Sequence, residues 1–154
     1  MRSINHSLTL AVAASLCLGV ASVSAAEPIG LVKSAEGKAV ALRDGKSTPL
    51  KAGDDLFKND QLTTDGQGAL GLVLRDDTTL SLGPNSKLVL DDFVFEPAAD
   101  KLGLNMRMAK GTFSVLTGQI AKLAPERTSI RTPVATIGIR GTRFLVEVEG
   151  GSDE

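Results

Sequence analysis

The sequence predicts an all-β protein with about 11–12 short strands in a single domain. Apolar residues alternate with polar ones along much of the chain, and turn-forming residues recur about every ten positions. No helical pattern of ten or more residues is present in the sequence. Two architectures fit these observations, a β-sandwich and a solenoid-like β-roll. The chain of 154 residues has room for one domain of ordinary size.

The amino-terminal segment, residues 1–26, is typical of a secretory signal peptide. Arg2 places a basic side chain near the amino terminus, and an uncharged, largely apolar run extends from Leu8 to Val23. Small residues follow, and we expect cleavage after Ala25 or Ala26. The strongly apolar part is shorter than the roughly 20 residues of a spanning helix. We therefore expect export, with no stable membrane insertion after cleavage.

Cys17, the single cysteine of the chain, lies inside this leader. A lipoprotein needs a small residue directly before its modified cysteine, whereas Leu16 stands there, so we do not expect lipidation. The predicted domain, residues 27–149, contains no Cys and no His. It must therefore be stabilised by its apolar core without a disulfide. The polar residues 150–154 are expected to form a flexible tail.

Turn signals divide the chain after Pro28 into short strands. Glycine readily adopts a positive φ, and Asp or Asn side chains bond back to the local backbone. Such residues cluster at Asp44-Gly45, Gly53-Asp54-Asp55, Asp65-Gly66, Asp76-Asp77, Gly83-Pro84-Asn85 and Asp91-Asp92. We expect a turn at each cluster and a strand between successive clusters.

Alternation within the strands predicts which side chains face the core. The last strand should turn Arg143, Leu145, Glu147 and Glu149 toward solvent. Residues 118–124 alone could form a helical turn or two. The predicted core-facing residues are Leu70, Leu72, Leu74, Leu80, Leu82, Leu88, Leu90, Leu102, Leu104, Met106, Met108, Phe113, Val115, Phe144, Val146 and Val148.

Composition argues against several classes of function. The chain has 17 basic and 18 acidic residues, so it lacks the basic excess that nucleic acids or anionic membranes require of a partner. The predicted domain has no His, Cys or Tyr, so we expect no enzyme and no cofactor. A two-carboxylate glycosidase stays formally open, but Trp and Tyr are absent and all five Phe lie in hydrophobic or strand contexts.

Three pairs of acids are candidate calcium ligands: Asp54-Asp55, Asp76-Asp77 and Asp91-Asp92. Calcium takes six to eight oxygen ligands, and Asp is common among them. None of these pairs has the spacing of a calcium loop, and turn formation explains them without an ion. We expect no metal site.

The most informative segment runs from Thr132 to Phe144, where Gly138 and Gly141 interrupt a β-branched strand. Glycine within a strand marks a bulge or the close approach of another backbone. Arg140 lies between the two glycines, and its planar guanidinium suits a bidentate carboxylate partner. We favour an internal pair with an Asp of a turn, for instance Asp76 or Asp77. The other interpretation is capture of a partner's carboxylate or of another external anion.

An ordered series of short motifs resembles the FecR domain family. It comprises Gly53-Asp54, Asn59 to Thr64, Gly68 to Leu74, Asp76-Asp77-Thr78, Leu82 to Leu88, Gly111-Thr112-Phe113, Thr132 to Thr136 and Ile139 to Phe144. The resemblance implies an all-β fold in the periplasm. It also implies that Gly138, Arg140, Gly141 and Thr142 belong to the family signature, with a fold-defining role first and a binding role second.

The best-known members of that family pass an outer-membrane signal to a cytoplasmic sigma factor through a cytoplasmic region and a membrane-spanning helix. Here a leader stands in place of both, so we do not expect direct control of a sigma factor. We expect a non-catalytic periplasmic protein-interaction or signalling-accessory module, which binds another envelope protein by adding a strand to a sheet edge. The alternative is a carbohydrate- or cell-envelope-binding module.

Overall fold

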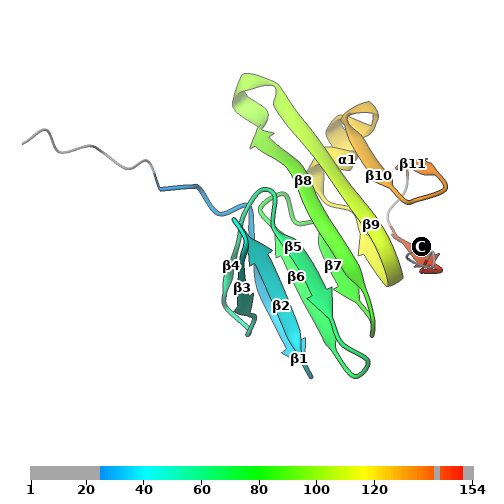
Figure 1. The fold of residues 1–154 in the computed structure, drawn as a ribbon. Helices are drawn as coiled ribbons and strands as arrows, with labels where there is room; N and C mark the ends of the chain where they lie inside the picture. Colours follow the sequence, from blue (N-terminus) through cyan, green and yellow to red (C-terminus); the bar gives the residue numbers. More distant parts are fainter. Residues whose placement is uncertain (1–24, 141–142, 151–154) are drawn as a thin grey trace, which may run out of the picture.

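The computed structural model describes residues 25–140 and 143–150. Most of the predicted leader (residues 1–24), most of the predicted tail (residues 151–154), and the signature residues Gly141 and Thr142 lie outside these ranges. The described residues form twelve strands and one short α-helix, which confirms the predicted all-β class (Figure 1). No helix within them is both long and apolar enough to span a bilayer.

The elements follow one another along the chain without long irregular segments. The α-helix, α1, spans Gln119–Leu123, and two 3-10 turns, η1 and η2, span Pro97–Ala99 and Pro125–Arg127. The strands are β1 (Gly30–Glu36), β2 (Ala39–Arg43), β3 (Lys46–Pro49), β4 (Asp55–Leu56), β5 (Gln61–Thr64), β6 (Ala69–Leu74), β7 (Thr79–Leu82), β8 (Lys87–Glu96), β9 (Lys101–Leu116), β10 (Thr128–Arg131), β11 (Thr136–Gly138) and β12 (Arg143–Val148).

All twelve strands belong to one strongly curled sheet (Figure 1). Its order is β3-β2-β5-β8-β9-β7-β6-β1-β4, with β10 and β12 also paired to β9, and β11 paired to β10. The pairs are antiparallel except that β10 runs parallel to β9. Of the two predicted architectures, a roll therefore describes the molecule better than two separate sandwiched sheets, although it has no repeating solenoid rungs.

Strand β9 is the longest and connects the two halves of the curled sheet. Its first part pairs with β8 as far as Lys110, and its second part pairs with β7 and β12. Gly111 lies between them with φ +106°, and a Cβ there would stand 2.1 Å from the Ser86 hydroxyl. No other residue fits this bend, so the sheet changes direction at a glycine.

One contiguous apolar core fills the curl, and the predicted alternation is confirmed. The predicted core-facing residues are buried, except Leu102, Phe144 and Val146, which are half-buried. Arg143, Leu145 and Glu147 are exposed, as expected. The helical turn predicted over residues 118–124 is also present, as α1. The alternation of apolar and polar residues thus predicted most core residues correctly, because each strand has one face inside the curl.

The turn predicted at Asp91-Asp92 is wrong. Both residues lie inside β8, where the register with β9 shifts between Leu90 and Asp92. The extra residue is accommodated as a β-bulge, and Asp91 pairs across the ladder with Arg107. Elsewhere the turn signals hold, as at Asp44-Gly45, where both residues have a positive φ.

Candidate functional site

The internal ion pair predicted for Arg140 is wrong. Arg140 follows β11 and is exposed, and it takes part in no ion pair within residues 25–140 and 143–150. The two carboxylates proposed as partners have other donors. Asp77 accepts a hydrogen bond from the Gln119 side chain, and Asp76 is fully buried against the start of α1.

Asp76 organises the junction between the β6–β7 turn and α1. Its carboxylate accepts hydrogen bonds from the Thr78 hydroxyl (2.8 Å), the Thr78 backbone N–H (3.1 Å) and the Ile120 N–H (3.2 Å). Its carbonyl accepts a further bond from the Gln119 N–H (2.7 Å). A Cβ on Gly118 would stand 2.1 Å from this carbonyl oxygen, so the close contact requires glycine. The carboxylate therefore serves the fold.

The close backbone approach or bulge predicted at Gly138 is also wrong. Gly138 pairs in regular register with Ser129, and a Cβ built on it would meet no atom within 4 Å. The strand predicted from Thr132 to Phe144 is also shorter than expected, because Thr132 to Ala135 form the turn of the β10–β11 hairpin. Signature residues Gly141 and Thr142 lie outside the described residues.

A second buried carboxylate, Asp60, was not singled out from the sequence. It accepts two hydrogen bonds from the Arg43 guanidinium (2.6 and 2.7 Å) and one from the Phe57 N–H (2.9 Å). The same guanidinium carbon lies 4.1 Å from the centre of the Phe57 ring. The hydrogen bond to Asp60 raises the pKa of Arg43 above its usual value, although partial burial opposes it. The pair joins β2 to the turn before β5.

Two of the three acid pairs named as candidate calcium ligands have protein cations as neighbours. Asp54 pairs with Lys51, Asp91 with Arg107 and Asp92 with Lys58. In the part of the chain that the structure describes, no three Asp, Glu, His or Cys side chains come together as metal ligands would. These carboxylates are accounted for by turns and surface ion pairs.

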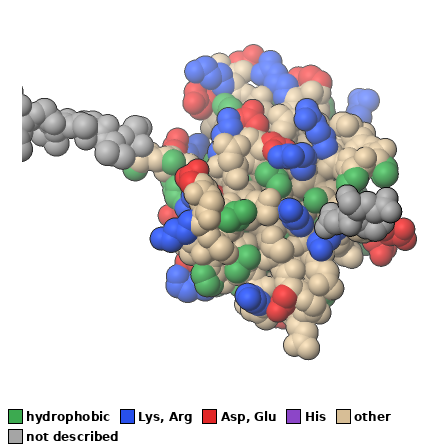
Figure 2. Space-filling view, viewed as in Figure 1, with side chains coloured by type: hydrophobic (Ala, Val, Ile, Leu, Met, Phe, Trp, Pro, Cys, Tyr) green, Lys and Arg blue, Asp and Glu red, His purple; other side chains and the backbone are tan. Residues whose placement is uncertain are grey.

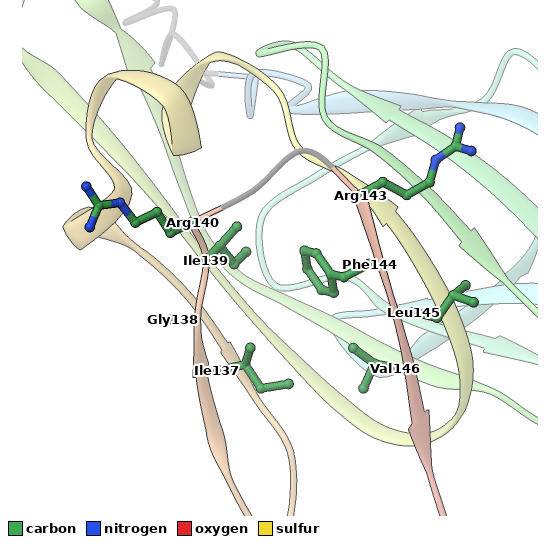
Figure 3. Close-up of a pocket in the computed structure, with 8 residues that line it drawn as sticks. All are labelled: Ile137, Gly138, Ile139, Arg140, Arg143, Phe144, Leu145 and Val146. Carbon is green, nitrogen blue, oxygen red and sulfur yellow. The ribbon is translucent and has the colours of Figure 1, made fainter.

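An apolar groove lies between β11 and β12 (Figure 3). Ile137 and Ile139 point into it from one side, and Phe144 and Val146 point into it from the other. Its volume is about 360 Å³, and a second hollow of about 410 Å³ continues from Ile137 and Val146 along the β10–β11 hairpin.

The two arginines beside the groove do not form a shared anion site. Figure 3 shows Arg140 and Arg143 pointing away from the groove in opposite directions. Basic and acidic side chains are interspersed over the visible face of the molecule (Figure 2). The groove therefore offers mainly apolar contact, with Arg140 and Arg143 in its lining but with their guanidinium groups directed away from it.

Strand β12 also offers a free backbone edge. Within the described residues it pairs with β9 alone, and β11 pairs with β10 alone. Leu145, in the middle of β12, is 75% exposed, and Leu116 on the neighbouring β9 is 40% exposed. A six-residue strand without proline, with one unpaired edge and an exposed leucine, can accept a further strand. The alternation of residues 143–148 was visible in the sequence, but the free edge was not.

Comparison with known protein families gives a match, which covers most of the residues described above. A family model described as FecR protein matches residues 60–154. The match covers Asp60, the Asp76 junction, the bend at Gly111 and the whole groove. No curated protein and no solved structure matches the chain significantly.

Proposed function

The chain belongs to the FecR family, and from this premise we propose that it is a non-catalytic periplasmic module that binds another envelope protein through β12 and the adjoining groove. FecR domains are associated with envelope signalling and are generally non-catalytic. The proposed role is accessory to such signalling.

The observation that carries the proposal is the free edge of β12 beside an apolar groove. An added strand gains affinity from main-chain hydrogen bonds and specificity from pockets for alternate side chains. β12 supplies the hydrogen-bonding edge, and half-buried Phe144 and Val146 supply apolar contact. Covering these side chains would remove apolar surface from water, which favours association.

Photo-cross-linking in cells tests the proposal. A photoreactive residue replaces Leu145 in one variant and Thr48, on the terminal strand β3, in the control. We expect the Leu145 variant to give an adduct with a defined envelope protein and the Thr48 variant to give none. Equal adducts from both positions, or none from Leu145, would contradict the proposal.

The periplasmic location rests on the predicted leader and needs its own measurement. Cell fractionation should place the mature chain in the periplasm, and mass spectrometry should find its first residue at Ala26 or Glu27. An intact leader on a cytoplasmic chain would refute export. Retention on peptidoglycan or polysaccharide, without a protein adduct, would favour the alternative of an envelope-binding module.

A further inference from the structure

The β12 edge is self-complementary, and we infer that two copies of this chain pair through it as antiparallel strands. The inference rests on the proposed function in one respect, since both require β12 to accept a further strand. The edge accepts one strand at a time, so self-pairing and binding of another envelope protein are alternative states of the same chain.

The outer face of β12 carries three exposed side chains. Arg143, Leu145 and Glu147 alternate along the strand and are all exposed. Within the described residues, neither Arg143 nor Glu147 forms an ion pair. Residues four apart on a strand are separated by roughly 13 Å, so the two charges cannot pair with each other. Their neighbours on β9 are uncharged.

A twofold axis at Leu145 matches these residues to one another. In antiparallel pairing centred there, Arg143 lies opposite Glu147 of the partner subunit, and Glu147 lies opposite the partner's Arg143. Leu145 then lies opposite Leu145 of the partner subunit, which covers a side chain that is 75% exposed. Both charges and the leucine thus find partners from one symmetric contact.

The inner face of β12 is complementary in the same register. Phe144 lies opposite Val146 of the partner subunit, and Val146 lies opposite the partner's Phe144. Aromatic and β-branched residues form favourable cross-strand pairs. A slip of one residue would set the outer face of one strand against the inner face of the other. A slip of two would place Leu145 opposite a charged residue, so one register is preferred.

The other strands with a single partner lack this property. β3 reads Lys46 to Pro49 and contains a base, no acid and a proline, whereas β4 has two residues and β11 has three. None of them can set opposite charges against each other about a twofold axis. Self-pairing is therefore specific to β12 among the single-partner strands of the described ranges.

Engineered cysteines test the register. The full chain carrying Cys17→Ser provides a background without native cysteine. Leu145→Cys lies on the proposed axis, so it should form a disulfide-linked dimer on mild oxidation. Arg143→Cys and Glu147→Cys should cross-link when the two variants are mixed, and neither should cross-link alone. Thr48→Cys on β3 is the control. Cross-linking of Thr48→Cys as efficiently as Leu145→Cys would overturn the inference.

Charge exchange tests the same contact without new bonds. Arg143→Glu and Glu147→Arg each set like charges opposite one another, and each should weaken dimerisation at least tenfold in sedimentation velocity. The double variant restores opposite charges and should recover the dimer. Both positions are exposed, so circular dichroism should show unchanged folding for all variants. A wild-type chain that remains monomeric at high micromolar concentration would overturn the inference.

The results also separate this inference from the proposed function. A monomeric chain whose position 145 cross-links to another envelope protein retains the proposed function and loses the dimer. A dimer with adducts only to itself retains the inference and loses the proposed function.

Discussion

The free edges of the curled sheet differ in length and composition. The terminal strands β3 and β4 lie close together, and their exposed edges are short, with Lys46 and Pro49 on β3 and only two residues in β4. Charged residues, proline and short length are the usual means of preventing unwanted strand pairing. β12 presents six residues without a proline, although Arg143 and Glu147 in it are charged. The greater length of this edge supports the proposal that β12 accepts a further strand.

Burial follows the same division. In the first nine strands most inward leucines are almost completely buried, as at Leu72 and Leu80. In β11 and β12, Ile137, Phe144 and Val146 are only half-buried. The first region therefore supplies most of the free energy of folding, whereas the second leaves apolar surface partly accessible to solvent.

The largest contrast should come from glycine substitutions in the two regions. Gly111→Val puts a branched side chain at positive φ and within 2.5 Å of Ser86, so strain and overpacking should together cost about 2–6 kcal/mol. Gly138→Val meets open space and should change stability by less than about 0.5 kcal/mol. Urea unfolding of both variants measures the difference, and equal midpoints would contradict the assignment of the bend.

Truncation of apolar side chains should destabilise the protein more in the first nine strands than in β12. Leu72→Ala removes a completely buried side chain and should cost about 2–5 kcal/mol. Val146→Ala, at a half-buried position, should cost less than about 1.5 kcal/mol. Thermal melting of the two variants gives the comparison. A larger loss for Val146→Ala would mean that β12 belongs to the stabilising core.

Removal of a buried carboxylate should cost more than removal of a surface one. Asp76→Ala leaves the N–H groups of Thr78 and Ile120 without their acceptor and should cost about 2–3 kcal/mol. Asp91→Ala breaks an exposed pair with Arg107 and should cost about 1 kcal/mol or less. Hydrogen exchange should also show that α1 opens more readily in Asp76→Ala. Unchanged exchange in α1 would contradict its role there.

The smallest effect on stability is expected from the titration of Asp54, just before β4. A side-chain hydrogen bond from Lys51, supported by the Lys51 backbone N–H, lowers the pKa of Asp54. Because the pKa of Asp54 is lower in the folded than in the unfolded protein, its ionised carboxylate stabilises the fold at pH values above the unfolded-state pKa. This stabilisation is lost as pH falls through the folded-state pKa. Asp54→Asn should remove that part of the acid dependence between neutral and strongly acidic pH. Identical acid titrations of wild type and variant would refute it.

Particular residues show how far local sequence could lead. The alternation from Leu70 to Leu74 predicted a buried face correctly, because burial on a strand depends only on which side of the pleat a residue occupies. The helical turn after Gly118 was also predicted. The turn predicted at Asp91-Asp92 is wrong, because the β-bulge in the β8–β9 pair uses the same residue types as a turn. A local pattern cannot distinguish the two when the deciding contact is on another strand.

The partners of the charged residues could not be predicted from the sequence. Arg140 was expected to meet Asp76, yet Asp76 binds the start of α1, more than forty residues along the chain. Asp60 likewise finds Arg43, seventeen residues away. These partnerships depend on which strands become neighbours. Net charge and residue type carry no information about that order.

By itself, the sequence determined the all-β class, the inward face of most strands and membership of the FecR family, because periodicity and ordered motifs are local properties of the chain. Only the tertiary structure decided which edge stays free, which carboxylates are buried and where the apolar groove lies. The reason is physical: a free edge or an ion pair is a relation between segments distant in sequence, and only the curl of the sheet brings them together.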